Sequence, residues 1–251
     1  VGMGAFVAIV GVAGVFLIDN PKKFENAEKK NTSYWADLFY GFRPSVIKEN
    51  SRLYLTLVAL GSFSVAFQVF FPYLFVYLGN VIIPGAVFDT KTIIVAVVAV
   101  AGLVAGIVVL LKVADKNKLK AFIPTIILFI VGLAILSTST NIVVVLIGIA
   151  PTLIGYVILQ IQLSAAVRDF IPEDKVGLFQ GIRMIFMVLI PMVVGPMIGD
   201  VACQMSNLTI IEYGVEKLVP STSMFLFASI VAVTVFVPII ILAKKKAFAK
   251  Q

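Results

Sequence analysis

The sequence predicts an all-α protein, a polytopic membrane helix bundle with seven transmembrane helices. Of its 251 residues, 61% are hydrophobic and 13% are charged, whereas a soluble domain has about 45–50% apolar and about 25% charged residues. Seven stretches approach the length of about 20 apolar residues that a helix needs to cross a bilayer. Helices are expected because the alternating pattern of a membrane barrel strand is absent, and open strands cannot satisfy their backbone groups in lipid.

The seven predicted spans follow one another along the whole chain. In order, they cover residues 1–18, 53–78, 92–111, 121–138, 141–166, 179–199 and 223–243. We expect the first span to belong to a longer chain, because the sequence opens on Val1 and is apolar from there. All 20 lysines and arginines except Lys91 and Lys217 fall on one side of this arrangement. Positive charge marks the cytoplasmic side, which predicts an integral plasma-membrane protein with its tail, 244–251, in the cytoplasm.

The polar segment 19–52 divides the first span from a block of six spans, 53–243. It begins with DNPKKFENAEKKNTS, a turn-rich stretch, and then predicts a short amphipathic helix. Its apolar side consists of residues at helical spacing, which are Trp35, Leu38, Phe39 and Phe42. Such a helix is typical of the inner membrane interface, and packing on the underside of the bundle fits the pattern equally well.

The composition argues against an enzyme. The sequence has no histidine and one cysteine, Cys203, so the commonest metal ligand and the commonest acid–base group at neutral pH are missing. No charged residue is expected near the middle of a span, where it would be the default functional candidate. We therefore expect no cofactor and no metal. The net charge of +7 belongs to lysines and arginines beside the spans, so no nucleic-acid partner is expected.

Helix-breaking residues interrupt the span 179–199. They lie in LIPMVVGPMIGD, residues 189–200, and are Pro191, Gly195, Pro196 and Gly199. A proline inside a soluble helix costs about 3 kcal/mol, but in a membrane neighbouring helices can satisfy the freed backbone groups. Glycines four residues apart let a neighbour approach closely. The pattern predicts a bent, closely packed helix suited to moving between two states, with a static packing kink as the alternative.

Two charged loops face the predicted cytoplasmic side. KVADKNKLK, 112–120, contains the pair Asp115 and Lys116, and VRDFIPEDKVGLFQGIR, 167–183, contains Arg168, Asp169 and Arg183. The second loop offers an ion cluster. Exposed pairs contribute only about 0–1 kcal/mol, so ordinary solvated loops are the alternative.

Together these features resemble the second half of a major facilitator superfamily transporter. One span, a long cytoplasmic linker and six further spans follow the order of that family's sixth to twelfth helices. Gly195, Pro196 and Gly199 match its Gly-Pro motif of the form GPxxG. Asp115 and Lys116 match the Asp-Arg pair of its charged loop, GxxxDRxGRR, although Leu111 and Lys118 replace two glycines of that motif.

The resemblance implies roles for the charged loops and a set of partners. The loop between the family's tenth and eleventh helices is similar to 167–183. The implied inner gate consists of Asp115, Lys116, Arg168, Asp169 and Arg183. The implied partners are a small-molecule solute, the lipid bilayer and an N-terminal half of the same transporter. A coupling cation is left open, because the spans offer no carboxylate for it.

Uncharged polar side chains gather in the two spans 53–78 and 141–166, which the resemblance assigns to the transport cavity. The expected solute-binding residues are Gln68, Tyr73, Tyr156 and Gln160. Amides and phenols suit neutral, hydroxyl-rich solutes, and QVFFPY, 68–73, is mildly similar to sugar:cation symporters. The alternative for each residue is a hydrogen bond between helices, worth about 0.6 kcal/mol on average.

The predicted function is therefore secondary active transport, by alternating access, of a small neutral or hydroxylated solute. Two alternatives stay open. One is a noncatalytic membrane scaffold or assembly protein, and the other is a half-sized transporter that acts as a dimer. A missing N-terminal half is favoured, because the span 1–18 matches a sixth helix and has no role as a lone start.

Overall fold

The computed structural model describes residues 40–82, 90–113, 118–172, 175–206, 208–212 and 214–245. The chain divides into two units, Val1–Leu38 and Phe39–Gln251, and all described residues belong to the second. The predicted span 1–18 and the loop pair Asp115 and Lys116 lie outside the described residues. So does most of the predicted amphipathic helix, of which Phe42 is described and exposed.

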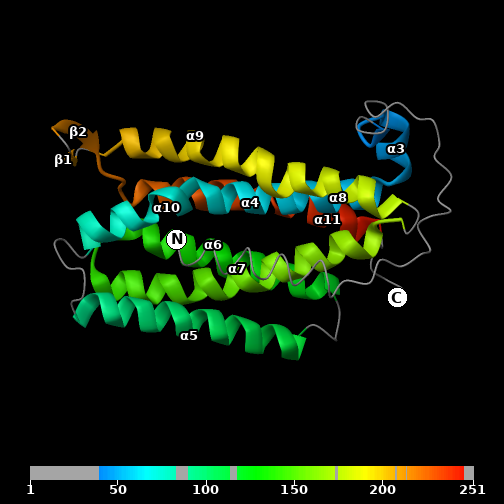
Figure 1. Cartoon of the computed structure of the whole chain (residues 1–251). Helices are drawn as coiled ribbons and strands as arrows, with labels where there is room; N and C mark the ends of the chain where they lie inside the picture. Colours follow the sequence, from blue (N-terminus) through cyan, green and yellow to red (C-terminus); the bar gives the residue numbers. More distant parts are fainter. Residues whose placement is uncertain are drawn as a thin grey trace, which may run out of the picture. The chain divides into compact units, whose positions relative to one another are not determined.

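The described unit is almost entirely helical (Figure 1). Its α-helices are α3 (Pro44–Glu49), α4 (Ser51–Tyr77), α5 (Thr90–Val113), α6 (Lys118–Thr138), α7 (Ile142–Phe170), α8 (Val176–Met184), α9 (Ile190–Gln204), α10 (Ser223–Val233) and α11 (Phe236–Lys244). Two π-helical turns extend or join them, η2 (Leu78–Ile82) after α4 and η4 (Ile185–Leu189) between α8 and α9.

Five described segments are long and apolar enough to cross a membrane. They are Ser51–Ile82, Ala121–Thr138, Ile142–Phe170, Val176–Gln204 and Ser223–Lys244. Each overlaps one predicted span. The predicted span 92–111 lies within α5, whose stretch Ile93–Val108 is apolar and helical but shorter than the other five. The all-α membrane bundle is thus confirmed, and the count of seven spans stays a prediction.

A small β-hairpin departs from the all-α prediction. Strand β1 (Thr209–Glu212) pairs antiparallel with β2 (Val215–Leu218), with Thr209 opposite Leu218. Gly214 lies in the turn with φ at 78°, a conformation that glycine adopts without a Cβ clash. The hairpin occupies the segment between the last two spans, for which the sequence analysis predicted no structure.

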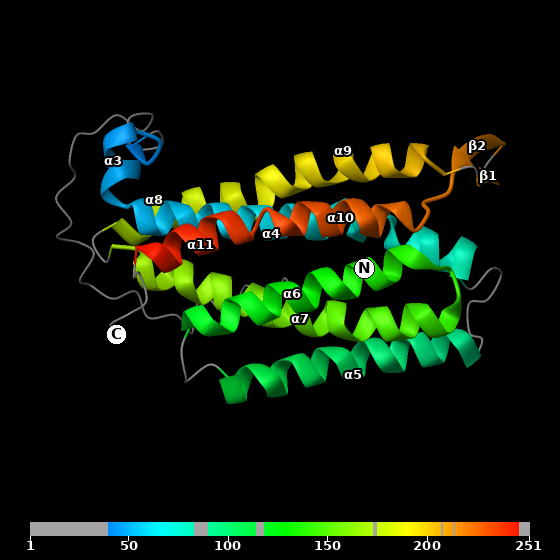
Figure 2. The same cartoon turned by 180° about the vertical axis from the view of Figure 1, so that it is seen from behind.

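Helices α4 and α7 organise the bundle. Helix α4 packs against α9, α10, α11 and α7, while α7 lies between α5 and α6 (Figures 1 and 2). Glycines allow the close contacts of α7. A Cβ atom on Gly155 would lie 2.8 Å from the backbone nitrogen of Phe129 in α6. On Gly106 of α5, it would lie 3.2 Å from the Cα atom of Ile154. The helices therefore meet through small residues, as is usual where lipid provides no hydrophobic drive between them.

One end of the bundle carries α3 and the basic residues. The hydroxyl group of Tyr54 donates a hydrogen bond to the carbonyl oxygen of Gly41, which ties the segment before α3 to α4. Lys245 Nζ, after α11, donates to Ser51 Oγ at the start of α4, over 3.0 Å. The described lysines and arginines with described side chains gather at this end, except Lys217 in the hairpin; they are Arg43, Lys48, Arg52, Arg168, Lys175, Arg183, Lys244 and Lys245.

Candidate functional site

The helix with the Gly-Pro motif touches α4 almost backbone to backbone. Gly195 and Gly199 are both buried in α9. A Cβ atom on Gly195 would overlap Cβ of Gln68 and lie 2.8 Å from its carbonyl carbon. A Cβ atom on Gly199 would overlap the carbonyl oxygen of Val69 and the ring of Tyr73. The two helices can therefore lie this close together only because Gly195 and Gly199 have no side chain.

A side-chain hydrogen bond reinforces the same contact. The hydroxyl group of Tyr73 donates to the carbonyl oxygen of Pro196 over 3.0 Å. Tyr73 is half-buried, and its ring lies against Gly199. Tyr73 thus fastens α4 to the part of α9 that holds the second proline.

A π-helical turn lies directly before the first proline. Residues Ile185–Leu189 form η4, and Pro191 follows at the start of α9, where it is buried. Proline has no N–H group and its ring crowds the preceding turn, and π-helical turns are a common irregularity at such points and at functional sites. The turn also rests on α4, because a Cβ atom on Gly61 would lie 3.2 Å from the carbonyl oxygen of Phe186.

Aromatic rings fill the space between α4 and α7. The ring of Tyr156 stacks on Phe67 with centroids 4.4 Å apart and an interplanar angle of 23°. Phe67 in turn stacks on Phe71 at 4.6 Å, and Phe63 lies 5.7 Å from Tyr156. This face of α4 is distinct from the one that carries Gln68 toward α9.

A cavity of about 830 Å³ opens beside these rings, toward the hairpin end of the bundle. We call it the aromatic cavity. Helices α4, α5, α6, α7 and α10, with η2, supply its lining, which is Phe67, Phe70, Phe71, Leu74, Phe75, Tyr77, Leu78, Gly79, Val95, Ala96, Leu136, Val145, Ile149, Thr152, Leu153, Tyr156 and Phe225. The side-chain polar groups of this lining are three hydroxyls, on Tyr77, Thr152 and Tyr156.

The four expected solute-binding residues do not share this cavity. Tyr156 lines it, whereas Gln68 and Tyr73 lie at the contact with α9. Gln160, one helical turn beyond Tyr156, is half-buried and is not part of the lining. Sequence reasoning did not single out Tyr77, which shares the cavity with Tyr156. The only feature of the sequence that could have pointed to Tyr77 was a hydroxyl group within the apolar span 53–78.

The described gate residues lie at the basic end of the bundle. Arg168 is exposed in the last turn of α7, and the next residue, Asp169, is half-buried. Arg183 in the last turn of α8 is half-buried, and its Nε atom has no hydrogen-bond partner within the described part of the chain. Lys175, between these two helices, donates to the hydroxyl oxygen of Tyr40 over 3.1 Å. The ion cluster stays a prediction.

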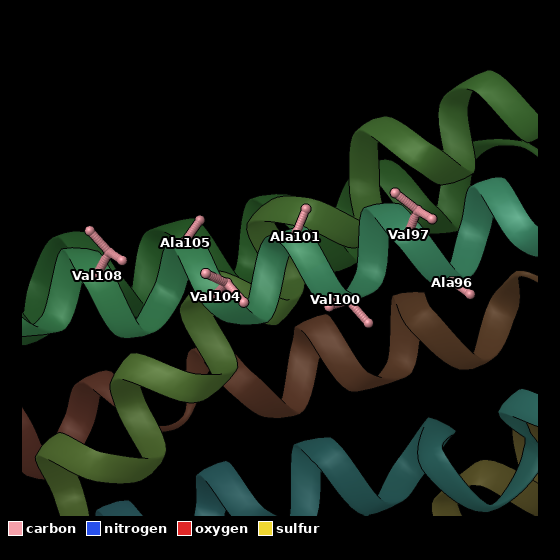
Figure 3. A pocket seen from close by; sticks show the side chains of 7 residues that line it. All are labelled: Ala96, Val97, Val100, Ala101, Val104, Ala105 and Val108. Atoms are coloured by element: carbon pink, nitrogen blue, oxygen red, sulfur yellow. The ribbon is translucent and has the colours of Figure 1, made fainter.

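A second, shallow hollow follows α5. Figure 3 shows its lining, which consists of Ala96, Val97, Val100, Ala101, Val104, Ala105 and Val108. Alanine and valine side chains offer no hydrogen-bonding group, so this surface cannot orient a polar solute. In a membrane it suits contact with lipid or with another apolar helix.

The comparison with protein families decides the class of the protein. The family model described as Major Facilitator Superfamily matches residues 1–196, which is most of the chain. The chain belongs to the major facilitator superfamily. Members of this superfamily are membrane transporters and not enzymes. A comparison with curated proteins and one with solved structures find no match.

The described residues contain no group of three or more histidine, cysteine, aspartate and glutamate side chains able to hold a metal ion. The apolar helices and the family together make this an integral membrane protein of the transporter type.

Proposed function

We propose that the chain is the C-terminal half of a secondary active transporter, which moves a small neutral solute by alternating access. In this arrangement the span 1–18 ends the N-terminal half, and 19–52 is the cytoplasmic linker. The six helical spans from α4 to α11 form the C-terminal bundle. The tail 244–251 lies on the cytoplasmic side of the plasma membrane.

The contact between α4 and α9 is the observation that carries this proposal. A helix with two prolines and a π-helical turn rests on α4 through glycines and through the bond from Tyr73 to Pro196. Contacts of this kind hold two helices close without interlocking large side chains, so a small sliding movement of one helix is sterically allowed. Alternating access requires such movements of helices around the solute.

The orientation rests on charge. Basic side chains gather at the end of the bundle that carries α3. Two of them, Lys175 and Lys245, donate hydrogen bonds there to Tyr40 and Ser51. Basic residues favour the cytoplasmic side of a membrane. The gate that we propose at this end combines Arg168, Asp169 and Arg183, and the family motif adds Asp115 and Lys116 of the segment 112–120 to it.

The proposal of a neutral solute rests on the lack of charged residues near the middle of the predicted spans. The polar residues Gln68, Tyr73, Tyr156 and Gln160 offer hydrogen bonds but no counter-charge. A hydroxylated solute, such as a sugar, is the narrower form of the proposal. Coupling to a cation would need an acidic group from the N-terminal half, because acidic side chains inside a membrane are the usual carriers of coupling protons.

Solute uptake by the native polypeptide in liposomes tests this function. We would measure the flux of labelled monosaccharides, disaccharides and nucleosides, with and without an imposed proton or sodium gradient. Gly181→Ala is a control substitution that should leave the flux unchanged, because a Cβ atom at this position meets nothing within 4 Å. Saturable flux of at least one solute in the native protein and in this control is expected. Folded protein without saturable flux of any of them would favour the scaffold alternative.

A further inference from the structure

We propose that the hairpin formed by β1 and β2 docks on the lipid bilayer, with Ile211 and Val215 among the headgroups and the first carbons of the acyl chains. In the proposed topology the partner is the outer leaflet of the membrane. The inference goes beyond the proposed function, because it concerns a surface of the protein that lies outside the proposed solute site and gate.

The hairpin exposes large apolar side chains. Ile211 is 80% exposed and Val215 is 58% exposed, and every residue of β2 is exposed. Single exposed apolar residues are common on protein surfaces, but a two-stranded hairpin that stands alone in water is marginally stable at best. An exposed hairpin of this composition therefore indicates a partner that covers it.

Apolar side chains lie on both faces of the hairpin. Residues directly opposite each other in an antiparallel pair share a face, and successive residues of a strand point to opposite faces. Ile211 is opposite Glu216 on one face, and Val215 is opposite Glu212 on the other. A protein partner covers one face of a hairpin, whereas a lipid layer surrounds it. The headgroup layer also offers water and cationic ammonium groups to the two carboxylates, so it suits the apolar and the charged side chains together.

The base of the hairpin is fixed to the end of the bundle. The backbone nitrogen of Val219 donates to the carbonyl oxygen of Leu208 over 2.8 Å, and Val219 is buried. Ser223 Oγ, at the start of α10, donates to the carbonyl oxygen of Ala202 in α9 over 2.8 Å. Figures 1 and 2 show the hairpin at about the level at which η2 ends and α5 begins. Its strands have four residues each, so it reaches about 14 Å at most from this base and stays close to the membrane surface.

The backbone limits how deeply the hairpin enters the lipid. Its sheet has two strands, so the outer edge of each strand lacks a partner strand among the described residues. Unpaired backbone groups are not tolerated in the hydrocarbon core, where there is no water, but water is present among the headgroups. The hairpin therefore lies at the boundary between the headgroups and the acyl chains, where a water-soluble reagent still reaches its base.

A second copy of the chain is the competing partner. A free strand edge can pair with the edge of another hairpin, which would join the two hairpins into one larger sheet. Such pairing would cover the backbone edges but leave Ile211 and Val215 on the two open faces of that sheet. Lipid covers both side chains, and this difference favours the bilayer as the partner.

Fluorescence quenching in bilayers of phosphatidylcholine tests the proposal with the purified full chain. The environment-sensitive fluorophore nitrobenzoxadiazole is attached to Ile211→Cys or Val215→Cys in the Cys203→Ser background. The quenchers are lipids with a nitroxide at the headgroup, at the top of the acyl chain or near its end, and iodide in the water. We expect the strongest quenching from the nitroxides at the headgroup and at the top of the acyl chain, since interfacial segments lie about 5–10 Å deep in this boundary.

Two further positions calibrate the measurement. Val233→Cys lies at an exposed position in the middle of the span Ser223–Lys244, and its probe should respond most to the nitroxide near the end of the acyl chain. Thr140→Cys lies at an exposed position in the polar loop between α6 and α7, at the hairpin end of the bundle (Figure 1). Its probe should respond more to iodide than the probes on the hairpin do.

Two serine substitutions in β1 separate the effect of the apolar side chain from that of the strand. Ile211→Ser removes the exposed apolar group, so quenching of a probe at Val215→Cys by the acyl-chain nitroxide should fall about 2-fold or more, because interfacial binding scales with buried apolar area. Thr209→Ser is the matched control, since it lies on the same face of the same strand and removes one methyl group. It should leave the quenching unchanged. The probes on the otherwise unaltered hairpin decide the test if Ile211→Ser unfolds it.

Two results would overturn the proposal. One is that the probes at positions 211 and 215 respond to iodide as strongly as the probe at position 140 and to no lipid nitroxide, which would place the hairpin in water. The other is protection of both probes from every quencher, which would mean that protein covers the hairpin. Loss of that protection at one chain per nanodisc would identify a second copy as the cover. Neither result changes the expected solute flux, so the uptake experiment tests the proposed function independently.

Discussion

The hydroxyl group of Tyr73 in α4 donates a hydrogen bond to the carbonyl oxygen of Pro196 in α9, across 123 residues of sequence. The bond joins the helix with the aromatic face to the helix with the Gly-Pro motif. Tyr73→Phe keeps the ring against Gly199 and removes only the bond. We expect a loss of stability of about 0.6 kcal/mol, the average for such bonds in membrane proteins, measured as a lower free energy of unfolding in detergent.

The glycines of α9 are expected to be far more sensitive than an exposed glycine. In Gly195→Ala the new Cβ atom would overlap Cβ of Gln68, so the helices must separate, at a cost of about 1–3 kcal/mol for overpacking. Gly181→Ala, in the open part of α8, should be neutral or raise stability by about 0.5–1 kcal/mol, because alanine is the better helix former. Equal effects of the two substitutions in thermal unfolding would contradict the close contact.

Tyr77 should respond in the opposite direction to Tyr73. Its buried hydroxyl group has no partner among the described residues, and such a group costs about 1–3 kcal/mol when it is left unsatisfied. Tyr77→Phe should therefore leave the free energy of unfolding unchanged or raise it. A loss as large as that of Tyr73→Phe would show that the hydroxyl group has a partner in the membrane-embedded protein.

Chemical labelling of single cysteines tests the orientation. The one native cysteine, Cys203, is buried, and Cys203→Ser gives a suitable background. Leu218→Cys lies at an exposed position of the hairpin, and Lys245→Cys at an exposed position after α11. A membrane-impermeant maleimide added to intact cells should label the first and not the second. The reverse pattern would place the basic end outside and contradict the proposed topology.

The five described spans were predictable from the sequence because their apolar length alone indicates them. The prediction ended one span at residue 166, whereas α7 continues to Phe170 through Arg168 and Asp169. Charged side chains at a membrane surface can stay in a helix, since their backbone groups still bond within it. The π-helical turns η2 and η4 were not predicted, because their residues are as apolar as those of an ordinary span and carry no separate signal.

The candidate site was predictable only in part. Spacing within one helix placed Gln68 near the middle of its span, but it cannot show that Gly195 of another helix lies against it. The same holds for Tyr77, whose hydroxyl group is notable only because packing in three dimensions leaves it buried without a hydrogen-bond partner among the described residues. The short hairpin was missed since four residues per strand are too few for a clear alternating pattern, although Gly214 between two apolar runs is a turn signal.

The central claim is that these six helical spans are one half of a two-half transporter. The intact mass of the native polypeptide, with its N-terminal sequence, tests this claim most directly. We predict a mass well above the 27.1 kDa of this chain, with further apolar spans before Val1. A native mass of about 27.1 kDa would contradict the claim, and would leave either a half-sized transporter that acts as a dimer or a protein that does not transport.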